Sequence, residues 1–313
     1  MTETSSAISS LPDAPLVSII MNCYNGEKYL RESIDSVLCQ SYQNWEIIFL
    51  DNRSTDKSGE IFKSYLDERL NYYYNATHVH LSEARNQAVL KSKGPLIAFL
   101  DVDDYWLPNK LEYQVLSFAD PQVGMTCTNY ILLNERTRKK HKTQKVAFTK
   151  TLASGYVLND LLSNYFVHFS TFIVRREALA EFEYLFDRRF SVIHDFDLVI
   201  RLSLNWKLSS LQEPMSFYRW HDKNFGFISS LHISEEYRLW YEDAKLIPSI
   251  IKCPNFKVLT QKIRWYEIVK LLYEGDRCRV LFKLTGVPIF KKIKALVAIM
   301  SPTIFVRKWV KRS

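Results

Sequence analysis

Acidic and polar residues stand directly after three short apolar runs of the sequence. The densest group is Asp101, Asp103 and Asp104, which follows the apolar residues 96–100. Carboxylates this close together raise one another's pKa unless a cation lies between them. Mg²⁺ or Mn²⁺ suits such a group, because these ions take one or two protein carboxylates and keep positions for water and substrate phosphates. The alternative is a turn or a helix cap, since Asp is common in both.

The other two groups follow the first and second apolar runs. Residues 22–26 are Asn-Cys-Tyr-Asn-Gly, and residues 51–56 are Asp-Asn-Arg-Ser-Thr-Asp. Asp51 could contact a ribose or a base, but the first turn lacks the glycines that a dinucleotide fold needs beside the pyrophosphate. Asp51 and Asp56 could equally cap the helix that follows them.

Two further candidates lie downstream. Asp195 and Asp197 precede an apolar run with helical spacing. A carboxylate there could take the proton of an attacking hydroxyl group as a general base, or Asp195 could cap the helix while Asp197 interacts with its dipole. His221 ends the segment Phe-Tyr-Arg-Trp-His. A neutral imidazole could bind a metal ion and a cationic one could pair with phosphate, although a lone His is more often a packing or surface residue.

The apolar runs have the length and order of strands in an α/β protein. Runs at 16–21, 46–50, 96–100 and 124–133 alternate with segments of helical periodicity, among them 27–40 and 82–92. The spacing predicts βαβ units and a mostly parallel, helix-covered sheet. Ligands of such sheets bind beyond the carboxyl ends of the strands, so the groups described above should meet at one edge.

The chain of 313 residues is expected to have three parts: a disordered arm at 1–15, a main domain at 16–230 and a helical, basic, amphipathic extension at 231–313. The arm lacks the basic and apolar regions of a signal peptide. The apolar stretch 295–306 is shorter than the ~20 residues that span a bilayer. Five cysteines without C-x-x-C spacing predict neither a disulfide framework nor a zinc site, and suit a reducing cytosol.

The charge is divided unevenly along the chain. The formal net charge is +8, but residues 252–313 carry 15 Lys and Arg against three acids, a net +12, which leaves −4 for the remainder. Apolar residues in 289–300 follow helical spacing with the lysines toward the other side, and beyond Pro302 apolar and basic residues are interleaved. This composition predicts a peripheral protein bound to the anionic cytoplasmic face of a membrane. The alternative is a helix packed on the main domain with a solvated basic face; nucleic acid is not expected as a partner.

Four motifs in order resemble glycosyltransferase family 2, inverting nucleotide-sugar enzymes of GT-A fold, over roughly residues 16–230. They are V-S-I-I-M-N-C-Y-N, E-I-I-F-L-D-N-R-S-T-D, S-E-A-R-N-Q-A-V and G-P-L-I-A-F-L-D-V-D-D. The resemblance implies a nucleotide-binding N-terminal half, in which Asp51 contacts the base, Asp101 contacts the ribose or metal, and Asp103 holds Mn²⁺ or Mg²⁺. It further implies that Asp195 is the catalytic base and that His221 approaches the metal or diphosphate. The remaining residues expected near the nucleotide are Asn22, Tyr24, Asn25 and Arg85.

The expected function is metal-dependent transfer of a sugar from a UDP-linked donor to a hydroxyl group of a glycan or lipid-linked acceptor in surface polysaccharide biosynthesis. Two alternatives remain: a catalytically inactive nucleotide-sugar-binding or scaffold subunit, and a nucleotidyltransferase, which would release pyrophosphate.

The sequence departs from the family pattern at several positions. Asn22-Cys23 replaces Pro-Thr or Pro-Val, and His194 replaces the Glu usually found before the base. Arg53 stands where glycine is usual and is expected to alter that turn. His80 and Ala88 also stand where many members carry glycine. No carboxylate assigned to the chemistry is lost.

Overall fold

A computed structural model describes residues 14–135, 143–221 and 233–300 of the chain. The expected arm at 1–15 and the interleaved residues after Pro302 therefore lie mostly or wholly outside the described residues. The chain divides into two compact units, Met1–Val157 with Phe166–Asn224 and Leu158–Tyr165 with Phe225–Ser313. The short segment 158–165, which lies within the main domain expected from sequence, thus belongs to the second unit.

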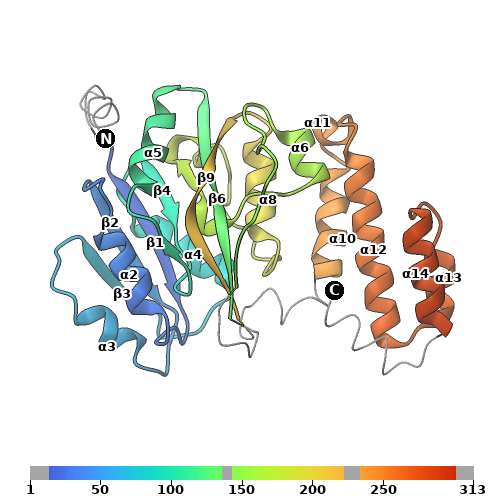
Figure 1. The fold of residues 1–313 in the computed structure, drawn as a ribbon, viewed down its shortest axis with the longest axis horizontal. Helices are drawn as coiled ribbons and strands as arrows, with labels where there is room; N and C mark the ends of the chain where they lie inside the picture. Colours follow the sequence, from blue (N-terminus) through green and yellow to red (C-terminus); the bar gives the residue numbers. More distant parts are fainter. Residues whose placement is uncertain (1–13, 136–142, 222–232, 301–313) are drawn as a thin grey trace. The chain divides into compact units, whose positions relative to one another are not determined.

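The first unit contains one mixed sheet, whose nine strands within the described residues run in the order β3-β2-β1-β4-β8-β6-β9-β5, with β7 beside β6 (Figure 1). The strands are β1 (Val17–Cys23), β2 (Trp45–Asp51), β3 (Leu70–Tyr74), β4 (Leu96–Phe99), β5 (Tyr105–Trp106), β6 (Val123–Asn134), β7 (Thr143–Val146), β8 (Ile173–Arg175) and β9 (Lys207–Trp220). Strands β3, β2, β1 and β4 are all parallel, as the βαβ spacing predicts. In the other half, β6 and β9 are parallel to each other, whereas β8, β5 and β7 are antiparallel to their neighbours.

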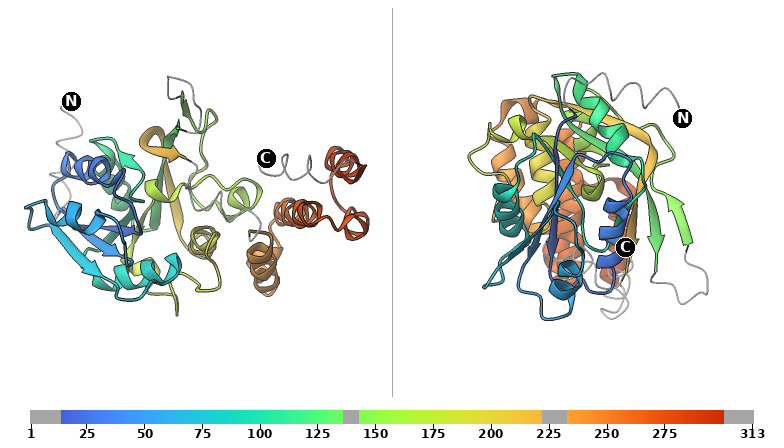
Figure 2. Two further views of the ribbon diagram at one scale, coloured as in Figure 1. Left: turned by 90° about the horizontal axis from the view of Figure 1, so that it is seen from below. Right: turned by 90° about the vertical axis from the view of Figure 1, so that its left-hand side faces the viewer.

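The first unit has helices on both faces of the sheet (Figure 2). They are α2 (Leu30–Leu38), α3 (Ser58–Lys63), α4 (Leu81–Lys91), α5 (Lys110–Leu116), α7 (Arg176–Leu179) and α8 (His194–Leu202), with the short 3₁₀ helices η1 (Ser117–Ala119) and η2 (Phe169–Thr171).

Because side chains alternate along a strand, β1 presents buried side chains to both faces of the sheet. Ile19 and Met21 pack in one core with Ile34 of α2. The helix α4 lies over the opposite face of the sheet (Figure 2), and its Ala84 and Ala88 are buried outside that core. Burial on both faces explains why these strands are almost continuously apolar.

Arg53 and His80 stand where glycine is usual in the family pattern, so their backbone conformations are of interest. Arg53 has a φ of 68°, in the left-handed region that glycine favours. The arginine therefore keeps a glycine-like backbone φ, at a strain of about 1 kcal/mol, and the expected alteration of this turn is not seen in φ. His80 has an ordinary extended conformation, with φ −60° and ψ 152°.

The second unit is helical. Its helices are α6 (Leu158–Ser163), α10 (Ile233–Ala244), α11 (Pro248–Ile251), α12 (Phe256–Glu274), α13 (Arg277–Lys283) and α14 (Ile289–Met300). Gly275 ends α12 in a left-handed conformation with φ 87°, and the Asp276 side chain accepts the Arg279 N–H to begin α13. The core between α12, α13 and α14 includes Ile268, Val280 and Ala295. In the described parts of the chain, no helix combines the length and apolar character needed to span a membrane.

Candidate active site

The loops after β1 and β2 are joined to each other at the carboxyl edge of the sheet. The Asn25 amide oxygen accepts the Thr55 backbone N–H at 2.8 Å, and the Gly26 N–H donates to the Ser58 hydroxyl at 2.9 Å. Asp56 accepts the Ser58 N–H at the start of α3 at 2.9 Å, although the capping position of that helix is held by Lys57. These hydrogen bonds hold the two loops in fixed positions relative to each other.

Asp51 is buried and has two partners. Its Oδ1 accepts the Ser54 N–H at 2.7 Å, and its Oδ2 accepts the Tyr72 hydroxyl at 2.9 Å. The carboxylate therefore shapes the turn after β2.

Two predicted residues lie at the end of β1 and in the loop after it. Tyr24 is 54% exposed and its ring centroid lies 4.4 Å from that of His78. The side-chain amide of Asn22, in contrast, is buried, and its nitrogen and oxygen have no hydrogen-bond partner within the described structure.

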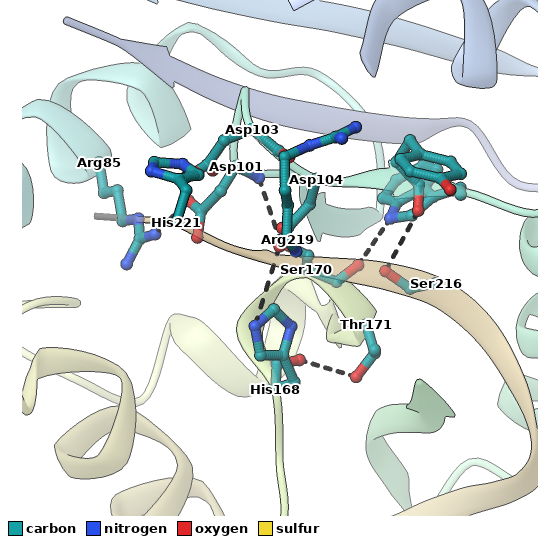
Figure 3. A network of polar contacts seen from close by, with 12 residues as sticks. Arg85, Asp101, Asp103, Asp104, His168, Ser170, Thr171, Ser216, Arg219 and His221 are labelled. Atoms are coloured by element: carbon teal, nitrogen blue, oxygen red, sulfur yellow. Dashed lines mark hydrogen bonds and ion pairs between the residues drawn. The ribbon is translucent and has the colours of Figure 1, made fainter. Parts of the chain in front are cut away.

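The acidic group after β4 forms a tight turn (Figure 3). The Asp104 N–H donates to the Asp101 carbonyl oxygen at 3.0 Å. The Asp104 carboxylate is buried and accepts the Ser170 hydroxyl at 2.6 Å and the Arg219 N–H at 2.9 Å. Burial, followed by the charges of Asp103 and Asp101, raises the pKa of Asp104 well above its ordinary value. Asp104 anchors the turn, and Asp101 and Asp103 remain partly exposed.

Arg219 is a buried residue that binds the backbone and a side chain of this turn. It is only 2% exposed, and its Nε donates to the Asp103 carbonyl oxygen at 2.9 Å. Its guanidinium also contacts Glu32 and, at 2.6 Å, Glu135. The two acids raise the pKa of Arg219 despite its burial. A buried cation tied to two acids and to the acidic turn holds that turn in one position.

Two contacts between side chains lie on the partly exposed side of the turn. Arg85 Nη2 lies 2.7 Å from Asp101 Oδ1, and His221 Nε2 lies 3.0 Å from Asp103 Oδ2. The His221 ring also stacks on Tyr29 at 5.1 Å between centroids. Across the described ranges, no group of three or more His, Cys, Asp or Glu side chains is arranged to hold a metal ion. A carboxylate and an imidazole side by side nevertheless suit Mn²⁺ or Mg²⁺ when phosphate oxygens and water supply the other ligands.

His194 is the second partner of Arg85. Its Nδ1 lies 3.1 Å from the Ser191 carbonyl oxygen, so Nδ1 must donate there. Its Nε2, which contacts Arg85 Nη1, is then an acceptor in a neutral ring. Burial and the nearby Arg85 charge both lower the pKa of His194 well below its ordinary value. A neutral histidine here leaves the Arg85 charge to act on Asp101 and Asp195, whereas a glutamate would neutralise it.

Asp195 lies in the first turn of α8. Its Oδ1 accepts the Phe196 N–H at 2.8 Å, but it does not cap the helix, because Ile193 holds the capping position. Burial raises the pKa of Asp195 to about 6, against the opposing effect of the Arg85 charge. Asp197 differs, because it is buried in an ion pair with Arg201 at 2.9 Å. Of the two acids, Asp195 has the properties of a base that works near neutral pH.

The structure thus brings several predicted residues together around Asp101: Arg85 contacts it, and Asp195 is close enough for their charges to interact. Asp103 and His221 form their own pair on the same turn. The Asn25 side chain accepts a hydrogen bond from Thr55 that joins two loops, and its contact with the nucleotide stays a prediction.

Four residues near the acidic turn have no role predicted from the sequence: Arg219, Ser170, His168 and Glu135. Only Arg219 had a sequence signal, its place two residues before His221, and nothing in the sequence indicated that it is buried.

Both a family model and a curated relative that this chain resembles are glycosyltransferases. Residues 18–182 match the family model described as Glycosyl transferase family 2. The UDP-Glc:alpha-D-GlcNAc-diphosphoundecaprenol beta-1,3-glucosyltransferase WfgD of Escherichia coli is 32% identical over 279 residues, which cover 88% of this chain and 94% of that protein.

Two solved structures share the fold. S. aureus TarS 1–349 in complex with UDP-GlcNAc is 17% identical with a TM-score of 0.56, over 95% of this chain and 90% of that one. The mannosyltransferase PcManGT of Pyrobaculum calidifontis, in complex with GDP-Man and Mn²⁺, is 15% identical with a TM-score of 0.60, over 95% of this chain and 84% of that one. The expected GT-A fold is therefore confirmed.

Proposed function

Because the chain belongs to glycosyl transferase family 2, we propose that it transfers a sugar from a UDP-linked donor to a hydroxyl group of a lipid-linked glycan, with inversion at the anomeric carbon. The observation that carries this proposal is the arrangement around Asp101. Arg85 lies against it, the Asp103–His221 pair stands on the same turn, and the Asp195 carboxylate has a pKa of about 6.

Each residue has a role that its surroundings suit. Asp195 accepts the proton of the acceptor hydroxyl group, because burial makes its carboxylate a stronger base than an exposed aspartate. Arg85 holds Asp101 for the ribose and provides positive charge for the nucleotide. Tyr24 offers an exposed ring to the base beside Asp51. Asn22 has a buried amide without partners in the described structure, which a bound nucleotide would satisfy.

Asp103 and His221 are the residues that would hold Mn²⁺ or Mg²⁺. Their carboxylate and imidazole leave most of the coordination to the diphosphate and water, which is how these cations bind beside nucleotides. When bound, the ion neutralises the charge that builds on the departing diphosphate. Arg219 keeps Asp103 in place through its backbone carbonyl oxygen.

The relative WfgD supports the choice of donor and acceptor. Its name describes transfer of glucose from UDP-Glc to GlcNAc-diphosphoundecaprenol, and this chain covers 94% of it. We infer a UDP-sugar donor and an acceptor sugar on a lipid diphosphate, in polysaccharide biosynthesis.

A transfer assay tests this function and its alternatives together. A panel of UDP-sugars is offered with a short-chain GlcNAc diphospholipid, and UDP, pyrophosphate and glycolipid product are measured. We expect UDP release matched by product formation, with the rate falling about a hundredfold or more when the divalent cation is chelated. Pyrophosphate release would indicate a nucleotidyltransferase instead, and UDP binding without turnover of any donor would indicate a scaffold subunit.

The second unit offers a surface that suits an anionic membrane. On α14, Ala295 packs into the helical core, whereas Ile293 and Val297 on another face are exposed. On α13, Phe282 is 84% exposed, and Arg277, Arg279 and Lys283 of that helix are exposed as well. Exposed apolar side chains beside basic ones are typical of helices that bind at an anionic interface. All five cysteines are free thiols, which fits a protein on the cytoplasmic face.

Replacing Phe282 and Phe290 together with Ser should weaken binding to anionic vesicles by about tenfold or more, because two aromatic side chains no longer enter the interface. Binding is measured by sedimentation with vesicles of phosphatidylglycerol and phosphatidylcholine. Leu246→Ser is the matched control, because Leu246 lies in the same unit and is about as exposed as Phe282, and it should bind as the wild type does. Equal binding of the double variant and this control would show that α13 and α14 do not contact the bilayer.

A further inference from the structure

Three aromatic side chains form a wall beside the acidic turn. They are Tyr130 of β6, His168 before η2, and Tyr218 of β9, and we call them the aromatic wall. The His168 ring lies 4.7 Å from that of Tyr130 and 4.4 Å from that of Tyr218, and the two tyrosine rings are 6.1 Å apart. The three residues are distant in sequence, and the sheet brings them together because β6 and β9 are neighbours.

Hydrogen bonding within the protein does not explain this cluster. Within the described ranges, neither tyrosine hydroxyl group makes a hydrogen bond to the protein, and His168 Nδ1 is buried without a partner. His168 Nε2 lies 3.8 Å from Asp104 Oδ2, too far for a hydrogen bond (Figure 3). Burial lowers the pKa of His168 to about 4, so its ring is neutral at pH 7. The wall is thus held by ring contacts, and the partly exposed tyrosines keep their polar ends available.

The position of the wall separates it from the nucleotide side. In the sheet, β1 and β2 lie on one side of β4 and carry Tyr24 and Asp51 at their ends, whereas β6 and β9 lie on the other side, beyond β8. The wall still lies beside the acidic turn, because His168 Nε2 is 3.8 Å from Asp104 Oδ2 and Tyr218 directly precedes Arg219, whose N–H donates to Asp104. A ligand on the wall would therefore meet the turn from the side opposite the base and ribose.

We propose that the aromatic wall binds the pyranose ring of the acceptor sugar. One face of a pyranose presents C–H bonds, which pack on an aromatic ring, while its hydroxyl groups point to the edge, where the tyrosine hydroxyls lie. The donor sugar must stay attached to the diphosphate at the turn, so a surface on the far side from the nucleotide suits the second substrate. This inference rests on the proposed function and adds the residues that recognise the acceptor.

Saturation-transfer NMR tests the wall without knowledge of the natural acceptor. The probes are the methyl α-glycosides of N-acetylglucosamine, glucose, galactose and mannose, each at millimolar concentration with the full chain, UDP and Mg²⁺. We expect saturation of the C–H protons of at least one glycoside. Tyr218→Leu should reduce that signal about fivefold by removing the ring, whereas Tyr218→Phe should retain it. Tyr156→Leu is the matched control, because Tyr156 is exposed at the opposite end of β9 and should leave the signal unchanged.

Three outcomes would overturn the proposal: no glycoside receives saturation, the signal is undiminished in Tyr218→Leu, or intact UDP-GlcNAc displaces the glycoside while UDP does not. The last result would place the donor sugar on the wall. Thermal unfolding of each variant checks that the fold is retained. Failure of the proposed function would appear separately, as absence of UDP release from every UDP-sugar in the transfer assay with wild-type protein.

Discussion

Asp195→Asn should reduce the rate of sugar transfer about 10³-fold while UDP binding is retained. An amide keeps the size of the side chain and can still accept the Phe196 N–H, but it cannot take a proton from the acceptor hydroxyl group. Removal of a general base typically costs about 10²–10⁴ in rate. The measurement is initial transfer rate at saturating donor, with UDP affinity determined by calorimetry.

The pKa of Asp195 adds a second check. Because burial raises it to about 6, half of the molecules lose the base at that pH, and the wild-type rate should fall as pH decreases through 6. Asp195→Asn should not lower the unfolding temperature, since burial disfavours the charge that it removes. Asp120→Asn, an exposed carboxylate at the far end of the strands, is the control and should keep full activity. A transfer rate for Asp195→Asn close to wild type would mean that another group accepts the proton.

Sequence patterns predicted the parallel half of the sheet well, and the reason is physical. A strand buried on both faces must be largely apolar, so β1, β2 and β4 appear as mainly apolar runs. The polar residues after such strands must then share one edge, which is why strand order and apolar patterning were enough to predict that Asp51 and Asp101 lie at the same edge of the sheet.

The other half of the site depends on contacts that no local pattern encodes. Arg219 and Ser170 act on Asp104 from segments 115 and 66 residues away. Strand β8 has three residues and β5 has two, too few for a periodic signal. The aromatic wall likewise exists only because β6 and β9 are adjacent.

The C-terminal helices illustrate the same limit. Helical spacing identified residues 289–300 as amphipathic, and α14 matches that range. The spacing did not show which face packs, because small residues fill the contact in place of large ones. Ala295 and Ala298 lie in the core, and Ile289, Ile293 and Val297 remain exposed.

Lys110→Met is expected to raise the free energy of unfolding at pH 7 by about 2 kcal/mol, the scale of an unsatisfied buried polar group. Lys110 is fully buried, and its Nζ has no hydrogen-bond partner within the described structure. The Nζ lies 3.9 Å from the Trp106 ring, which compensates only in part. Methionine fills a similar volume without a polar atom. Urea unfolding followed by tryptophan fluorescence measures the difference.

The pH dependence of the gain distinguishes removal of a buried amine from better packing of the methionine side chain. Burial lowers the pKa of Lys110 well below its ordinary value, so between that lowered pKa and about 10.4 the unfolded chain binds one more proton than the folded one. Wild-type stability from this group therefore increases with pH in that window, and the advantage of Lys110→Met should shrink between pH 7 and pH 10. Lys93→Met, at an exposed lysine, should show neither the gain nor the pH dependence. A loss of stability in Lys110→Met at pH 7 would mean that the folded chain compensates the buried amine, because otherwise its removal can only favour the folded state.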